Sequence, residues 1–148
     1  MKEFRNYICN ILEIDNVTIK SVSKKKLKEL SKCEHTLAAY DLENKCIYYL
    51  KKKEYDLTDY YLMAHEIRHA WQDKINPNFY FKEYYENMKE MEYHNNDAEI
   101  DANAFACIAI AIAFNKIVKR TYKSMPDIQK KYEKRIKELA KQYGIEFK

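Results

Sequence analysis

The sequence of 148 residues contains one glycine, Gly144, and only two prolines. Phosphate-binding loops need several glycines at fixed spacing, so neither G-x-x-x-x-G-K nor G-x-G-x-x-G occurs in this chain. This excludes the nucleotide-binding folds that depend on such loops. The shortage of residues that break helices also favours helical elements with short connections. The length fits one compact domain, 1–148, that buries its core without disulfide bonds.

The sequence also lacks paired cysteines, since its four cysteines show no C-x-x-C spacing. Each lies in or beside an apolar run, where free cysteine behaves as a small hydrophobic residue. This pattern is typical of a reducing compartment rather than of a disulfide framework. Residues 1–14 carry no secretory signal, and the most apolar run, 104–114, is about half the ~20 residues that a membrane span needs. We therefore expect a cytoplasmic protein with no membrane partner.

A strong charge imbalance is absent as well, because the net charge is only +4. Lysines cluster at 24–26, at 51–53 and between 116 and 148, whereas the stretch 83–101 is acidic. A basic segment can bind nucleic acid or an acidic partner, but solvated helix faces in lysine-rich proteins have the same composition. Because no recognition motif accompanies the charge, we do not expect nucleic acid as a partner.

Hydrophobic periodicity, capping residues and turn chemistry predict the elements along the chain. The predicted helices cover 2–13, 24–32, a segment from a cap at Asp56 or Thr58 to 74, a segment from Asn95 or Asn96 to 120, and 126–144, and the predicted strands cover 17–22, 36–40 and 46–50. Residues 41–45 have turn chemistry, which favours a β-hairpin between the last two strands. Residues 76–78 break the third helix.

Residues 65–69 read His-Glu-Ile-Arg-His, the HExxH pattern, inside a segment that is helical on other grounds. Four residues turn a helix through about 400°, so His65 and His69 project from one face, one turn apart. Two imidazoles so placed can bind one zinc ion, while Glu66 on the adjoining face reaches a water in the open coordination position. The ion lowers the pKa of that water towards roughly 7, and Glu66, as general base, takes its proton during attack on a carbonyl.

Catalytic zinc usually takes a third protein ligand, and Glu99 is the candidate. It lies near the start of a predicted helix that contains Glu-Ile-Asp-Ala-Asn at 99–103. Asn103 lies one turn further on and can hydrogen-bond the outer nitrogen of a ligand histidine. Asp97 and Asp101 are the alternative ligands, and Glu99 can also be a solvated carboxylate that the helix dipole favours in a first turn. The expected cofactor is one Zn²⁺ per chain.

These motifs resemble those of the gluzincin metallopeptidases, and most closely those of the compact ImmA/IrrE-type group. The resemblance covers about residues 46–106 and rests on His65-Glu-x-x-His69 followed by Glu99-x-x-Ala-Asn103-x-Phe-Ala. It implies two histidine ligands, the general-base glutamate and a glutamate ligand at those positions. It also implies that 46–50 is an edge strand that pairs with an extended substrate. Arg68 departs from the group, because many of its members have glycine there.

Substrate contacts are predicted at Tyr48, Tyr93 and His94. Tyrosine and histidine near such sites can stabilise the negative oxygen of the transition state. His94 can equally be a polar loop residue. The tyrosines between the two ligand helices that are candidates for the oxyanion role are Tyr80, Tyr84, Tyr85 and Tyr93.

The sequence therefore predicts an α+β fold in which a small, mostly antiparallel sheet precedes the two ligand helices and a C-terminal helix. The predicted function is hydrolysis of a peptide bond in an intracellular protein or peptide substrate. The alternative is a binding or regulatory module that keeps the metal-binding fold and does not turn over a substrate. A third reading is hydrolysis of a non-peptide amide, which the motif alone does not separate from proteolysis.

Overall fold

The computed structural model describes residues 1–31, 35–80 and 93–147, without the side chains of Phe79 and Tyr80. Its elements are α1 (Lys2–Ile11), β1 (Thr18–Val22), α2 (Lys24–Ser31), β2 (Ala38–Asp41), β3 (Cys46–Leu50), α3 (Leu57–Ile75), α4 (Pro77–Tyr80), α6 (Asp97–Phe114) and α7 (Pro126–Gln142). The predicted α+β class is confirmed. The predicted roles of Tyr84, Tyr85 and the side chain of Tyr80 fall outside the described residues.

The three strands form a mixed sheet in the order β1-β3-β2. Strands β2 and β3 pair antiparallel, which confirms the predicted hairpin, but β1 and β3 pair parallel, from Thr18 opposite Cys46 to Val22 opposite Leu50. The expectation of a mostly antiparallel sheet was therefore wrong. The parallel pairing has a physical reason. Helix α2 and strand β2 lie between β1 and β3 in the chain, and this connection is long enough to bring β3 back beside β1 in the same direction.

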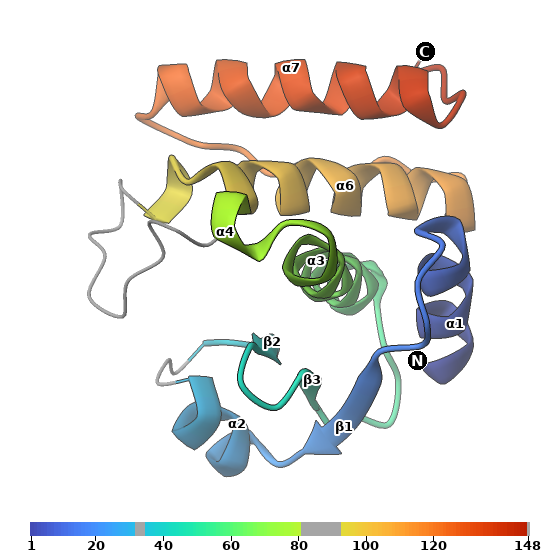
Figure 1. The fold of residues 1–148 in the computed structure, drawn as a ribbon, viewed down its shortest axis with the longest axis vertical. Helices are drawn as coiled ribbons and strands as arrows, with labels where there is room; N and C mark the ends of the chain where they lie inside the picture. The colour runs from blue at the N-terminus through green and yellow to red at the C-terminus, as the bar shows by residue number, and fades with distance from the viewer. Residues whose placement is uncertain (32–34, 81–92, 148) are drawn as a thin grey trace.

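The elements are stacked in layers, with α7 on the outside, then α6, then α3, then the sheet (Figure 1). Figure 1 shows α3 end-on beneath α6, with α1 at its side and α2 beyond the sheet. Helix α3 contacts β2 and β3 on one side and α6 on the other. A side chain on α3 can therefore meet groups from both the sheet and the second ligand helix.

Helix α6 is apolar on all sides over most of its length. Residues 104–114 are all alanine, isoleucine, phenylalanine or cysteine, and every residue from Ala98 to Ile110 is buried. A helix that is apolar all round is stable only in an interior, and α6 packs between α3 and α7. Within the described residues, no helix, α6 included, combines the length and apolar composition that crossing a membrane requires.

The ends of the predicted helices agree with the structure to within two residues, except for the end of α6. Helix α6 stops at Phe114 rather than at 120, because Asn115 adopts the left-handed conformation with φ 52° and ψ 39°. Asparagine tolerates this conformation better than most residues and often ends helices. Helix α7 starts at Pro126 as predicted, and Gly144 follows its last turn with a φ of 66°.

Candidate metal centre

Three potential ligand atoms meet in the interior between α3 and α6. The Nε2 atoms of His65 and His69 lie 3.0 Å apart. Oε1 of Glu99 lies 3.0 Å from the Nε2 of His69, and Oε2 of Glu99 lies 3.3 Å from the Nε2 of His65. The exposed fractions are 5% for each histidine and 1% for Glu99. As predicted, these residues come together, and the group can hold a metal ion.

The start of α3 fixes the direction in which the two histidines project. The Asp56 side chain accepts from the Asp59 backbone N–H at 3.0 Å, and the Asp59 side chain accepts from the Asp56 backbone N–H at 3.0 Å. Such a reciprocal capping box anchors the first turn of a helix. One turn of helix then separates His65 from His69, whose rings meet edge to face with centroids 4.6 Å apart.

The start of α6 places the third ligand. Oδ1 of Asn96 accepts a 2.9 Å hydrogen bond from the N–H of Ala98, so Asn96 is the N-cap. Glu99 therefore lies in the first turn, where the helix dipole stabilises a carboxylate. The sequence left open whether Glu99 is a ligand or a solvated carboxylate. In the structure its carboxylate is buried against the histidines.

The arrangement passes a geometric and chemical test for a metal site. Nitrogen and oxygen ligands at about 2.0–2.2 Å from a tetrahedral ion lie about 3.3–3.6 Å apart. The separation of 3.3 Å between Glu99 and His65 agrees with this range, and the two separations of 3.0 Å are slightly shorter. The Nδ1 of His69 lies 2.8 Å from Oε1 of Gln72, whose Nε2 donates to the carbonyl of Ala98 and to Asp101. In a metal-bound form the single proton of His69 would therefore lie on Nδ1, which would leave a lone pair on Nε2 for the metal.

Charge holds the ligand group together in the metal-free chain. Burial lowers the pKa of His69, but the adjacent Glu99 carboxylate outweighs it and raises this pKa to about 9. Burial raises the pKa of Glu99, but the charges and hydrogen bonds of His69 and His65 more than offset this and hold that pKa well below its ordinary value. A protonated imidazole thus balances the buried carboxylate, and a divalent cation would take over that role.

Glu66 lies beside the ligand group and is held by the sheet. Its Oε1 lies 4.0 Å from the Nε2 of His65. Its Oε2 accepts a 2.8 Å hydrogen bond from the backbone N–H of Tyr40 in β2. Burial raises the pKa of the Glu66 carboxyl, against the lowering effect of the two histidines. A carboxyl group with a raised pKa next to a metal site is suited to take up a proton and release it again.

The two alternative ligands occupy other positions. Asp97 is exposed at the start of α6. Asp101 is buried, but its carboxylate pairs with Arg68 from α3, with Nε 2.7 Å from Oδ2 and Nη2 3.1 Å from Oδ1. Burial raises the pKa of Asp101, and the Arg68 bonds and charge, followed by Arg135, outweigh it and lower the pKa. Arg68, where the sequence departs from the ImmA/IrrE-type pattern, thus forms a buried ion pair with Asp101.

The predicted role of Asn103 as partner of a ligand histidine was wrong. The outer nitrogen of His69 contacts Gln72, three residues further along α3. Asn103 instead donates to the hydroxyl of Tyr122 at 3.0 Å, and its backbone carbonyl accepts from Tyr61 at 2.9 Å. Its side chain therefore ties α6 to the segment before α7. The spacing of Gln72 from His69 is a signal that sequence reasoning could have used, because residues i and i+3 share a helix face.

The predicted substrate strand was also wrong. Strand β3 is the central strand of the sheet, so 46–50 is not an edge that can pair with a substrate. Tyr48 follows Ile47, which is fully buried in the core that includes Met63 and Ala64 of α3. Neighbouring strand residues point to opposite faces, so Tyr48 points away from α3, beside Cys46. It therefore does not face the metal site.

His94 and Tyr93 remain predictions as substrate contacts. His94 is buried, which excludes a solvated loop position, and its ring contacts those of Tyr93 and Tyr122 with centroids 5.4 and 5.7 Å away. Tyr122 was not among the tyrosines that the sequence suggested near the site, although it contacts both His94 and Asn103. Burial raises the pKa of Tyr122 to about 12 against the lowering effect of the Arg120 charge, with smaller raising contributions from Tyr132 and Glu99, so its hydroxyl stays protonated.

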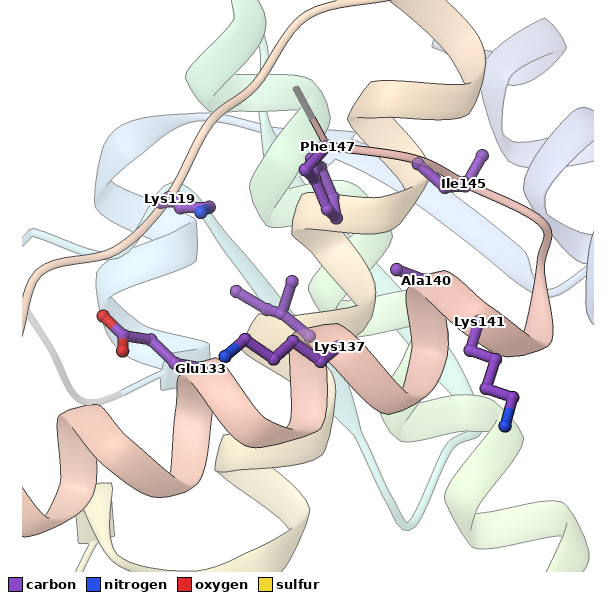
Figure 2. A pocket seen from close by; sticks show the side chains of 8 residues that line it. Lys119, Glu133, Lys137, Ala140, Lys141, Ile145 and Phe147 are labelled. Atoms are coloured by element: carbon purple, nitrogen blue, oxygen red, sulfur yellow. The ribbon is translucent and has the colours of Figure 1, made fainter.

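A separate hollow of about 550 Å³ lies where the residues after α7 turn back over that helix (Figure 2). Figure 2 shows Phe147 and Ile145 on one wall and Lys137 on α7. The Nζ of Lys119 lies 5.4 Å from the centroid of the Phe147 ring. None of the lining residues belongs to the ligand group, so this hollow is not the candidate active site.

The comparisons with known proteins add no assignment to this geometry. No family model matched the chain, and neither the search of the curated proteins nor the search of the solved structures returned a match.

Proposed function

We propose that the chain is a zinc-dependent peptidase that hydrolyses a peptide bond in a protein or peptide substrate. The supporting observation is the buried group of His65, His69 and Glu99 with the Glu66 carboxyl directly beside it. The motif resemblance to the gluzincins of the ImmA/IrrE type supports the same function, and with it a compact zincin fold.

Zinc is the metal that we propose for this group. Two imidazoles and one carboxylate are a common protein ligand set of catalytic zinc, and three protein ligands leave the fourth position open. When bound, zinc supplies Lewis acidity, which polarises a carbonyl and lowers the pKa of a water molecule. The chain supplies the burial, the two imidazoles whose Nε2 atoms face each other, and the carboxylate that matches their charge.

Glu66 is the proposed general base. Since Oε2 is engaged by the Tyr40 N–H, Oε1 is the oxygen that faces the ligand group and accepts the proton. The raised pKa of Glu66 lets the same oxygen hold that proton until it passes to the nitrogen of the leaving amine.

Strand β2 supports a peptide substrate. It is an edge strand, and the hydrogen bond from the Leu50 N–H to the Leu37 carbonyl sets which of its residues face β3. By alternation, the backbone groups of Ala38 and Tyr40 face the opposite way, and the Tyr40 N–H does so in reaching Glu66. An extended peptide that paired there would run past the general base.

The test combines metal analysis with a degenerate peptide library, read by mass spectrometry. The zinc-loaded chain should bind about one zinc and cleave library peptides, and the Glu66→Gln variant should bind zinc without cleaving. Zinc binding without cleavage of the library or of protein substrates would favour the binding or regulatory module. Failure to bind any divalent metal would reject the metal centre itself.

A further inference from the structure

A continuous set of buried hydrogen bonds leads away from the ligand group. Gln72 accepts the Nδ1 proton of His69 at 2.8 Å and donates through Nε2 to Oδ2 of Asp101 at 2.8 Å and to the Ala98 carbonyl at 3.0 Å. Gln72 is fully buried, and Asp101 is 4% exposed. The path therefore runs from a metal ligand on α3 to a carboxylate on α6 without entering solvent.

Asp101 is the point at which three helices meet. It accepts from Arg68 of α3, and from Arg135 of α7, whose Nε and Nη2 both lie 2.8 Å from Oδ1. The Arg68 side chain is enclosed, with its guanidinium 3.6 Å from the centroid of the Trp71 ring. Each oxygen of the carboxylate thus has defined donors, so Asp101 can turn neither toward the histidines nor away from Gln72.

We propose that Gln72, Asp101 and Arg135 are positioning residues for His69, and that α7 thereby supports the metal centre from the far side of α6. The inference rests on the proposed metal centre, but not on peptide hydrolysis. It gives a role to the C-terminal helix, for which the sequence offered none. None of the three residues contributes an atom to the ligand group itself.

The direction of the hydrogen bonds carries the argument. The two acceptors beyond Gln72, the Ala98 carbonyl and the Asp101 carboxylate, require its NH₂ group to point toward α6. Its carbonyl oxygen must then point toward His69, where it accepts the Nδ1 proton and directs Nε2 to the metal. Among the described residues, the buried Nδ1 of His65 has no such partner, so His69 is the histidine that the protein orients from outside.

The test measures zinc affinity by competition with a chromophoric chelator, and the visible spectrum of the Co²⁺-loaded protein. Gln72→Met keeps the length of the side chain and removes all three of its hydrogen bonds, so it should weaken zinc binding by roughly 10–100-fold and shift the Co²⁺ bands. Arg135→Gln should weaken it less, in the same direction. Lys134→Gln removes the same charge from an exposed neighbour on α7 and should change neither readout.

Thermal unfolding of the metal-free variants separates positioning from stability. If Gln72→Met lowers the melting temperature while zinc affinity and Co²⁺ bands stay unchanged, the proposal is overturned. It is equally overturned if Lys134→Gln acts like Arg135→Gln, since the effect would then be general charge. If Gln72→Met does not fold, the partly exposed Arg135 decides the matter. If the wild-type chain binds zinc but cleaves no peptide, the proposed peptidase function is rejected, whereas this inference is not affected.

Discussion

Tyr40 holds Glu66 through a backbone hydrogen bond that spans 26 residues of sequence, and its side chain adds a second tie to the same helix. The Tyr40 hydroxyl donates to Oδ2 of Asp73 at 2.8 Å, two turns of α3 beyond Glu66. The edge strand and the helix are thus fixed to each other at two points of α3, one before and one after His69. The proposed general base is held by a backbone amide, so its position would not depend on the side chains of a substrate.

The Glu66→Gln variant should keep one zinc per chain and lose hydrolysis by roughly 10²–10⁴-fold. The amide keeps the size of the side chain and can still accept from Tyr40, but it cannot take a proton from water. Elemental analysis and cleavage of the best library peptide measure the two properties side by side. Full activity in this variant would remove the assigned general base.

The His65→Ala and Glu99→Ala variants should each lose stoichiometric zinc, because three protein ligands are needed for a stable site. Asp97→Ala is the matched control, since Asp97 lies two residues from Glu99 but is exposed. It should bind zinc like the wild-type chain. Elemental analysis after dialysis against a weak chelator gives the comparison. Stoichiometric zinc in Glu99→Ala would show that the third ligand lies elsewhere.

The ligand residues were predictable because what places them is local. The spacing of His65 and His69 fixes their common face within one helix, and the capping residue Asp56 lies only nine residues before His65. For Glu99, a helix start at Asn96 was sufficient. Fold class and most element boundaries followed in the same way from periodicity and capping.

The remaining features depend on contacts between distant segments. A strand-like run beside a turn identifies β3 as a strand, but it contains no information on whether β3 pairs on one side or on two. The partners of Asn103 come from α3 and from the segment after α6, which no local pattern brings together. Asn115 ends α6 by adopting a left-handed conformation, which its sequence neighbours do not distinguish from another helical turn.

The metal-free protein should lose stability as the pH rises from 6.5 to about 9. The pKa of His69 is raised in the folded state. The stabilisation that protonated His69 gives the fold is therefore complete below the ordinary pKa of 6.5 and is lost as the pH passes about 9. The pKa of Glu99 is lowered, so its contribution is present above its ordinary value of 4.5 and is lost at acidic pH. Melting temperatures in the presence of a chelator test this, and His69→Gln should flatten the alkaline slope. A wild-type melting temperature that is constant over that range would contradict the ion pair.

Arg68→Ala should destabilise the fold by about 3–5 kcal/mol, because it removes one partner of a buried ion pair. Asp101 would retain Arg135 and Gln72, which places the expected loss toward the lower value. Urea unfolding of the metal-free chain measures the change. Lys74→Ala, an exposed residue on the same helix, should stay within about 0.5 kcal/mol of the wild type. If the two substitutions lowered the free energy of unfolding equally, the buried ion pair would not have the structural role assigned to it.

The apolar surface that α6 presents on all sides after Asn103 has a consequence for how the helix packs. Alanine and isoleucine on every side mean that rotating α6 or sliding it by one turn would bury nearly as much apolar surface. Asp101 meets its cationic partners in only one such orientation, and any other would leave a charge stranded in the interior. The double variant Asp101→Leu with Arg68→Met should therefore keep its helix content but show more than one set of side-chain NMR signals, one for each packing. A single sharp set of signals would contradict this prediction. The ion pair therefore selects one of several packings that bury similar apolar surface. In the selected packing, Glu99 reaches the histidines.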